Sequence, residues 1–153
     1  MGDTLTVSPC IEGVIISPLK KIPDQRGMVM HMLRSDSSCF TTFGEIYFSV
    51  VNSGVVKAWK KHHRMTQNFA VPVGQIKLVI YDDRAESSTF GLVQEILTGI
   101  DEYFLVHIPP MLWYGFQGLS SDAAMIANCA SIPHDSEEVE RQEYNSSTIP
   151  YKW

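Results

Sequence analysis

The chain has 153 residues, of which 44% are hydrophobic, and it carries a formal net charge of −5 at pH 7. This length fits one domain over residues 1–153 with a substantial core, and the negative charge argues against nonspecific nucleic-acid binding, which needs a basic face. We expect neither a signal peptide nor a membrane span, because the apolar runs are short and interrupted. The three cysteines, Cys10, Cys39 and Cys129, are an odd number without close spacing, which favours a reduced, cytoplasmic setting.

Short runs rich in β-branched and aromatic residues follow one another along the chain, separated by turn residues. We predict strands over residues 14–19, 28–33, 46–51, 55–61, 69–73, 76–81, 92–97, 103–108, 112–117 and 124–129. Only residues 135–144 show a helical pattern, with Asp135 or Ser136 as N-cap. Ten closely spaced strands and one short C-terminal helix predict an all-β protein of the jelly-roll type.

The segment between residues 54 and 74 has the spacing of the first metal-binding motif of cupins, which reads G-x5-H-x-H-x4-E-x6-G. The corresponding positions here hold Gly54, Lys60, His62, Gln67 and Gly74. Lysine and glutamine replace two metal ligands, and an ammonium group beside His62 would repel a cation. The sequence therefore predicts a cupin barrel, or double-stranded β-helix, with no metal site.

The alternation of side chains along a strand predicts where these cationic groups point. Lys60 and His62 are two residues apart, so both should face one side, while Trp59, Lys61 and His63 face the other. Cations directed into a small barrel need an anionic or electron-rich ligand to offset their desolvation. The competing interpretation is a solvated cluster at the end of a hairpin.

Five stretches of the chain match motifs of one enzyme family. They are 24–27 for D-x-R-G, 55–60 for V-L-R-G-L-H, 83–91 for D-x-R-x-x-S-x-T-F-G, 108–116 for I-P-x-G-x-x-H-G-F, and the closing 149–153. From about residue 24 to residue 153 the chain thus resembles the dTDP-4-dehydrorhamnose 3,5-epimerase family of nucleotide-sugar cupins. The third stretch is the most specific of the five.

This resemblance implies a homodimeric jelly roll that acts on a nucleotide-sugar substrate in deoxysugar or surface-polysaccharide biosynthesis, without a metal or organic cofactor. A proton beside the C4 ketone is removed and returned on the other face, because the ketone lets the carbanion delocalise as an enolate. The protein must supply a base, an acid on the opposite face, and groups that stabilise the enolate oxygen.

Several positions that carry this chemistry in the family hold other residues here. The family's base histidine falls on Lys60, and its acid tyrosine falls on Asn128 or Cys129. The aspartate that orients the histidine falls near Ser146, and the histidine of I-P-x-G-x-x-H is Tyr114. The family's mechanism therefore cannot be transferred unchanged.

Two interpretations of these departures stay open. In the first, the chemistry survives with rearranged roles: His62 is the base and Lys60 stabilises the enolate, or Lys60 is itself the base, and Tyr114 or Cys129 is the acid. We favour His62, because a bound pyrophosphate would raise the pKa of Lys60. In the second, the pocket only binds a nucleotide sugar or carbohydrate. A ketoisomerase, which shares the enolisation step, is a further alternative.

Four residues are candidates for substrate binding. Arg26 is placed by its motif to contact a phosphate or sugar, although it can equally be a turn arginine paired with Asp24. Glu45 and Tyr47 share one strand face and are placed to meet the nucleotide base. Lys57 stands at the family's phosphate-binding arginine and keeps the charge without the bidentate fork.

Overall fold

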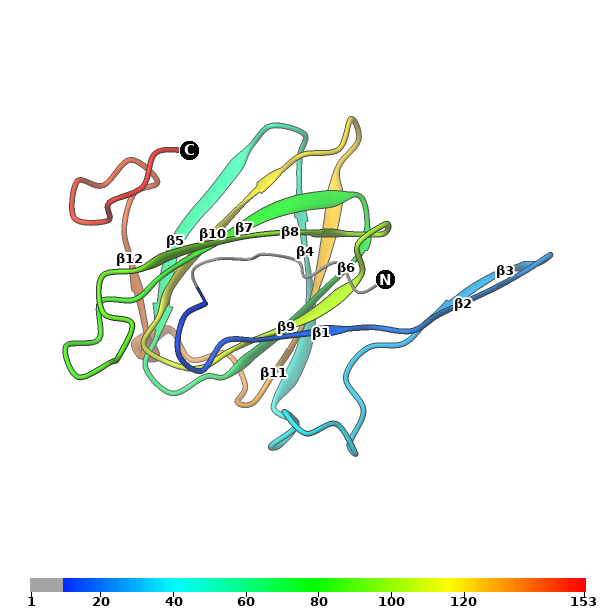
Figure 1. Cartoon of the computed structure of the whole chain (residues 1–153), viewed down its shortest axis with the longest axis horizontal. Helices are drawn as coiled ribbons and strands as arrows, with labels where there is room; N and C mark the ends of the chain where they lie inside the picture. The colour runs from blue at the N-terminus through cyan, green and yellow to red at the C-terminus, as the bar shows by residue number, and fades with distance from the viewer. Residues whose placement is uncertain (1–9) are drawn as a thin grey trace.

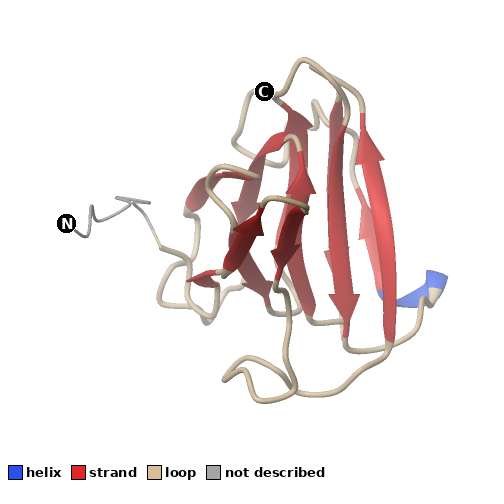
Figure 2. Ribbon diagram, turned by 90° about the vertical axis from the view of Figure 1, so that its right-hand side faces the viewer, coloured by secondary structure: helices blue, strands red, loops and turns tan. Residues whose placement is uncertain are grey.

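A computed structural model describes residues 10–153 as two five-stranded sheets in which all neighbouring strands are antiparallel. The first sheet has the order β1 (Ile15–Pro18), β9 (Phe104–Ile108), β6 (Gln67–Val73), β11 (Ala124–Ala130), β4 (Glu45–Val51). The second has the order β12 (Val139–Arg141), β5 (Val56–His62), β10 (Trp113–Gly118), β7 (Gln75–Tyr81), β8 (Val93–Gly99). The sheets face each other as a sandwich (Figure 2), which confirms the predicted all-β jelly roll.

A separate hairpin, β2 (Lys21–Asp24) and β3 (Gly27–Met30), projects from the sandwich as an arm (Figure 1). Strand β2 was not predicted, because Pro23 and the following aspartate indicate a turn. Apolar side chains of the arm are exposed, among them Ile22, Met28 and Val29.

The helix predicted over residues 135–144 is wrong in its extent. Only a 3₁₀ turn, η1 (Ser136–Glu138), forms there, with Asp135 as N-cap accepting a hydrogen bond from the Glu137 N–H at 3.0 Å. The next residues form β12, which pairs with β5 in the register Val139↔His62 and Arg141↔Lys60. Pairing with the open edge of β5 gives this backbone hydrogen-bond partners in the sheet, and that long-range gain outweighs the local helical pattern.

Most of the core lies between the two sheets. Its fully buried side chains include Ile76, Leu78 and Ile80 of β7 and Val71 of β6. A second cluster covers the outer side of the second sheet and contains Trp59, Val79, Trp113 and Ile149, with Tyr151 and Trp153 of the C-terminal segment packed against it.

The two glycines of the cupin-like motif both occupy turns. Gly54 precedes β5 with φ +76°, and Gly74 joins β6 to β7 with φ +77°. Residues other than glycine rarely adopt this conformation. At Gly74 a Cβ atom would also lie 2.8 Å from the Ala124 backbone. A side chain at this position is therefore disfavoured both by the backbone conformation and by lack of space. Within residues 10–153 no helix is long and apolar enough to cross a membrane.

Candidate active site

A cavity of about 630 Å³ lies between the two sheets, within the size range of small-molecule sites. One wall comes from the first sheet and consists of Tyr47, Ser49, Phe69, Ile126 and Asn128. The other wall comes from the second sheet and the segment after it, and consists of Lys57, Ala58, Trp59, Lys60, Tyr114, Phe116, Arg141, Gln142 and Glu143.

A bulge in β5 brings two lysines to the same wall. Tyr114 pairs with Lys60 and Phe116 pairs with Lys57, so β5 has one more residue than β10 over this stretch. Cross-strand partners point to the same side of a sheet. Lys57 and Lys60, three residues apart, therefore both line the cavity together with their aromatic partners.

The cations of this wall are only partly paired. The Lys57 ammonium donates to Ser49 Oγ and to the Val50 carbonyl, both at 3.0 Å. Neither the Lys60 nor the Arg141 side chain makes a hydrogen bond or ion pair with another residue of the described chain. Burial lowers the pKa of Lys60, and the nearby charges of Arg141 and Lys57 lower it further. A wall of this kind attracts an anion and holds a lysine that loses its proton more readily than usual.

His62 lies on the same side of β5 as Lys60, as predicted, but it does not line the cavity. Its ring is buried, with Nδ1 hydrogen-bonded to Glu138 Oε1 and Nε2 3.4 Å from the Tyr114 hydroxyl. The other Glu138 oxygen accepts the Arg64 N–H at 2.9 Å and the Met65 N–H at 3.2 Å. Tyr114 therefore stands between the imidazole and the cavity.

The charges of this buried group follow from its contacts. Burial lowers the pKa of His62, although Glu138 acts in the other direction. Burial alone would raise the pKa of Glu138, but hydrogen bonds from the Arg64 and Met65 backbone and from His62 together lower it. Burial raises the pKa of Tyr114 well above its usual value. The pair is thus a neutral imidazole on an ionised carboxylate, facing a protonated phenol.

The opposite wall carries a second polar group. Asn128 Nδ2 donates to the Tyr47 hydroxyl at 2.9 Å and to Gln67 Oε1 at 3.2 Å, while its Oδ1 accepts the Asn68 N–H at 3.2 Å. These contacts fix the orientation of the Asn128 amide. Burial raises the pKa of Tyr47, so its phenol is protonated at neutral pH.

Besides His62, three predicted site residues do not line the cavity of their own chain. Cys129 pairs with the exposed Ile46 on the outer face of the first sheet, so of the two positions considered for the family's tyrosine only Asn128 lines the cavity. Glu45 accepts the His134 N–H at 2.9 Å and supports the loop after β11. Arg26, at the tip of the arm, pairs with Asp24 at 2.8 Å and has a side chain 90% exposed.

Two residues near the cavity were not found from the sequence. Arg141 lines the second wall, and Glu138 holds the imidazole that backs this wall; both come from the segment predicted to be helical. Their position depends on the pairing of β12 with β5, for which the sequence contains no local signal. Ser146, where the family's aspartate falls, instead bonds to Gln142 and Thr148.

The positions that bind metal in the cupin motif have other surroundings here. Gln67, at the glutamate position of the cupin motif, accepts a hydrogen bond from Asn128, and Lys60 occupies the position of the first histidine. Within residues 10–153 no group of three or more His, Cys, Asp or Glu side chains is arranged to hold a metal ion.

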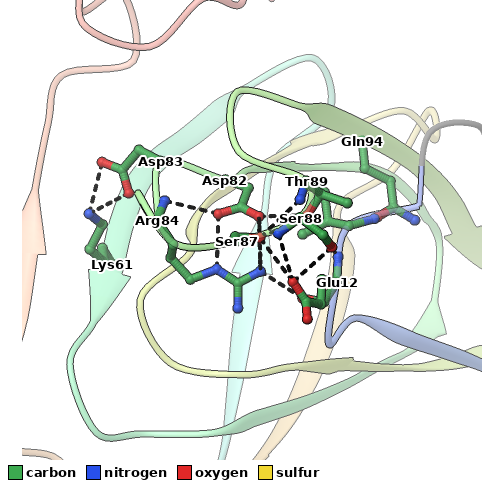
Figure 3. A network of polar contacts seen from close by, with 10 residues as sticks. Glu12, Lys61, Asp82, Asp83, Arg84, Ser87, Ser88, Thr89 and Gln94 are labelled. Carbon is green, nitrogen blue, oxygen red and sulfur yellow. Dashed lines mark hydrogen bonds and ion pairs between the residues drawn. The ribbon is translucent and has the colours of Figure 1, made fainter.

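The most specific family stretch is part of a polar network outside the cavity (Figure 3). Its ten motif positions run from Asp82 to Gly91, so the motif aspartate is Asp82 and not Asp83. Asp82, which is fully buried, accepts hydrogen bonds from Arg84, Ser87 and Thr89 at 2.6–3.0 Å. Burial alone would raise the pKa of Asp82, but these bonds lower it well below its usual range. Glu12 joins the network through Ser87 and Ser88, so these residues tie the N-terminal segment to the loop before β8.

On its outer face, β5 is fixed by a further contact of this loop. The Lys61 ammonium pairs with Asp83 at 2.7 Å, and the Trp113 indole N–H donates to the same carboxylate at 3.0 Å. Lys61 therefore faces away from Lys60 and His62, as the alternation predicts. Trp59 packs in the cluster on the outer side and also borders the cavity.

Comparison with known proteins connects this geometry to one family. A model described as dTDP-4-dehydrorhamnose 3,5-epimerase matches residues 9–153. The probable low-salt glycan biosynthesis epimerase Agl13 of Haloferax volcanii is 32% identical over 145 residues, which cover 94% of this chain and 90% of that protein.

Solved structures agree with this match. A dTDP sugar isomerase from Desulfovibrio desulfuricans G20 has 49% identity and a TM-score of 0.91, over 94% of this chain and 92% of that chain. ChmJ, a 3'-monoepimerase from Streptomyces bikiniensis, shares the fold with a TM-score of 0.84 at 17% identity, over 94% of this chain and 75% of that chain. The chain belongs to the dTDP-4-dehydrorhamnose 3,5-epimerase family.

Proposed function

We propose that the protein is a nucleotide-sugar epimerase, or a closely related isomerase, acting on a 4-keto-6-deoxy sugar nucleotide by cofactor-free proton abstraction beside the ketone. The observation that carries this proposal is the cavity itself, in which unpaired cations and protonatable groups face each other across the space between the sheets. The names of the similar proteins support the substrate class.

The cations of the second wall suit the diphosphate of a sugar nucleotide. Arg141 has no partner among the described residues, and Lys57 is held only by neutral oxygens, so both can bind phosphate without giving up a carboxylate. Lys57 lies where the family has arginine, which fits a phosphate contact made through charge alone. We assign Arg141 and Lys57 to substrate binding.

Lys60 is the better candidate for the base, in place of the initially favoured His62. A base must come within about 3 Å of the proton that it removes. Lys60 lines the cavity, whereas both His62 nitrogens face protein groups. Burial is the largest cause that lowers the pKa of Lys60, and it persists when Arg141 and Lys57, whose charges lower the pKa further in the free protein, bind the diphosphate. His62 then acts through Tyr114, whose hydroxyl it helps to orient.

A homodimer is part of this proposal. On the outer face of β4 the side chains of Ile46, Phe48 and Val50 are 47%, 61% and 51% exposed, an apolar strip on an edge strand. The apolar arm projects from the same sandwich and carries Arg26 at its tip (Figure 1). In a dimer the arm can pack on the partner, so that Arg26 reaches the partner's cavity. Phe48→Asp should then yield monomers in light scattering.

A cytoplasmic location fits the state of the cysteines. Cys10, Cys39 and Cys129 are all free thiols, which is usual in a reducing compartment.

The experiment that tests the function is NMR in heavy water with a panel of 4-keto-6-deoxy sugar nucleotides. We expect at least one to bind, to exchange a proton at C3 or C5 for deuterium, and to give an inverted product. Calorimetry on the same panel distinguishes an epimerase from a protein that only binds nucleotide sugars. Binding without exchange would show that the protein is only a nucleotide-sugar binder.

A further inference from the structure

Inversion of a carbon needs two proton-transfer groups on opposite sides of the substrate. In this cavity the lysines, Tyr114 and Arg141 all belong to the wall formed by the second sheet and its edge, so the second group has to come from the first sheet. We propose that Tyr47 is the proton donor that returns hydrogen to the substrate from the first sheet. This inference rests on the proposed function and adds a catalytic residue to it.

Tyr47 is the only residue of that wall with a suitable proton, among those that the structure describes. The other members are Ser49, Phe69, Ile126 and Asn128. Two of these are apolar, an amide does not titrate at neutral pH, and the aliphatic hydroxyl of Ser49 is a far weaker acid than a phenol. Tyr47 carries a phenol that burial keeps protonated.

The contacts of Tyr47 leave its proton available. Asn128 and Tyr47 are direct partners in the pairing of β11 with β4. The Asn128 amide is oriented by the Asn68 N–H on its oxygen, so its NH₂ group donates to the Tyr47 oxygen at 2.9 Å. The phenol oxygen is therefore an acceptor in this bond, and its own hydrogen has no acceptor among residues 10–153, which leaves it free to point into the cavity.

This arrangement also accounts for the altered family position. Asn128 stands where the family's tyrosine falls and contacts a tyrosine hydroxyl on the neighbouring strand. The phenol is thus supplied by β4 instead of β11, on the same wall. The alternatives considered from the sequence do not fit, because Tyr114 shares a wall with Lys60 and Cys129 faces outward.

The proton balance of the step is complete. The neutral amine of Lys60 takes the proton as the C–H bond breaks, and the electron pair moves onto the C4 oxygen as an enolate. The enolate carbon then takes the proton of the Tyr47 O–H bond from the other side, which leaves a phenolate next to the Asn128 NH₂ group. Water returns a proton to the phenolate and removes one from the Lys60 ammonium, so the site is restored without any other reactant.

The test compares exchange with inversion in Tyr47→Phe. In heavy water, with a dTDP-linked 4-keto-6-deoxyhexose as probe, NMR follows both deuterium uptake and the inverted product. We expect inversion to fall about 10²–10⁴-fold, the usual contribution of one acid, while deuterium uptake with retained configuration continues within about tenfold of the wild-type rate. Uptake continues because Lys60 can return a solvent-derived proton to the face from which it took one.

Tyr103→Phe is the matched control, because Tyr103 is buried and lies outside the cavity. This variant should invert at the wild-type rate. Inversion by Tyr47→Phe within about threefold of wild type would overturn the proposal. So would loss of exchange together with inversion, or loss of probe binding, because Tyr47 would then act in abstraction or in binding. A wild-type protein that binds the probe without exchange or inversion would count against the proposed function itself.

Discussion

The network around Asp82 and the cavity around Lys60 are both rich in charge, and they differ in how completely that charge is paired. Every oxygen of the buried Asp82 carboxylate accepts hydrogen bonds, from Arg84, Ser87 and Thr89 (Figure 3). In the cavity, Lys60 and Arg141 have no partner in the described chain. Buried charge is costly unless it is paired. Asp82 is fully buried, so its pairing stabilises the fold. Lys60 is only half-buried and Arg141 is exposed, so both stay charged without a protein partner and are available to an anionic ligand.

The same two regions also differ in how closely they match the family motifs. The stretch over residues 82–91 matches the family motif and lies in the network that holds the loop before β8. Of the positions where the chain departs from the family motifs, Lys60, Tyr114 and Asn128 line the cavity, whereas Ser146 does not. The framework is therefore kept while the chemistry inside it is rearranged.

The largest effect on stability is expected for Asp82→Asn. The substitution leaves Arg84 beside a neutral amide in a buried network, and breaking such a pair costs roughly 3–5 kcal/mol. Urea unfolding should show this loss at pH 7, with little change in turnover per folded molecule. Because the folded-state pKa of Asp82 is lowered, its contribution is present above about pH 4, the pKa range of an unfolded aspartate, and the difference between variant and wild type should shrink below that pH.

The arm provides the control for this substitution. Asp24 and Arg26 repeat the same two-residue spacing and the same bonds, but their side chains are 48% and 90% exposed. Asp24→Asn should change stability by less than about 1 kcal/mol. Equal losses in the two variants would show that burial is not what distinguishes the two pairs.

A smaller effect, on turnover, is expected for Glu138→Gln. Glu138 holds His62 Nδ1 and thereby directs Nε2 toward the Tyr114 hydroxyl that lines the cavity. Its loss should lower kcat by roughly 10–100-fold with a smaller change in KM, the range seen for residues that orient a functional histidine. Glu140→Gln is the matched control, because the side chain of Glu140 lies at the surface and pairs, among residues 10–153, with His63 alone. Unchanged kcat in Glu138→Gln would show that the buried pair has a structural role alone.

The smallest expected effect is a shift of the pH profile in Arg141→Gln. Arg141 pairs with Lys60 in the register of β12 with β5, and its charge lowers the pKa of Lys60. Neutral Lys60 is the active form, so kcat/KM, which reports the free protein, should rise with pH up to the pKa of Lys60. Removing the guanidinium raises this pKa, and the rising limb should move to higher pH. Arg64→Gln, at an exposed pair with Asp135, should leave the limb in place.

Much of the fold follows from local patterns in the sequence. Period-two alternation predicts the sheets and places Lys60 and His62 on one side of β5, and the two motif glycines fall at turns that need positive φ. The helix expected after Asp135 fails because an N-cap with acidic neighbours specifies only a first turn, while pairing of the next residues with β5 is decided over long range.

The site is harder to predict from the sequence, because it depends on long-range strand pairing. The bulge in β5 that brings Lys57 to the Lys60 wall depends on pairing with β10. The position of His62 behind Tyr114, and the contact of Asn128 with Tyr47, depend on which strands become neighbours. Spacing indicates which residues share a strand face, but not which of them reach the cavity.

The most direct test of the account is deuterium exchange by Lys60→Met beside the wild-type protein, with calorimetry on the same samples. We predict that the wild type incorporates deuterium at C3 or C5 of a dTDP-linked 4-keto-6-deoxyhexose, and that Lys60→Met still binds the compound but exchanges about 10²–10⁴-fold more slowly. Exchange by Lys60→Met at the wild-type rate would contradict the assignment of Lys60 as the group that meets the substrate proton.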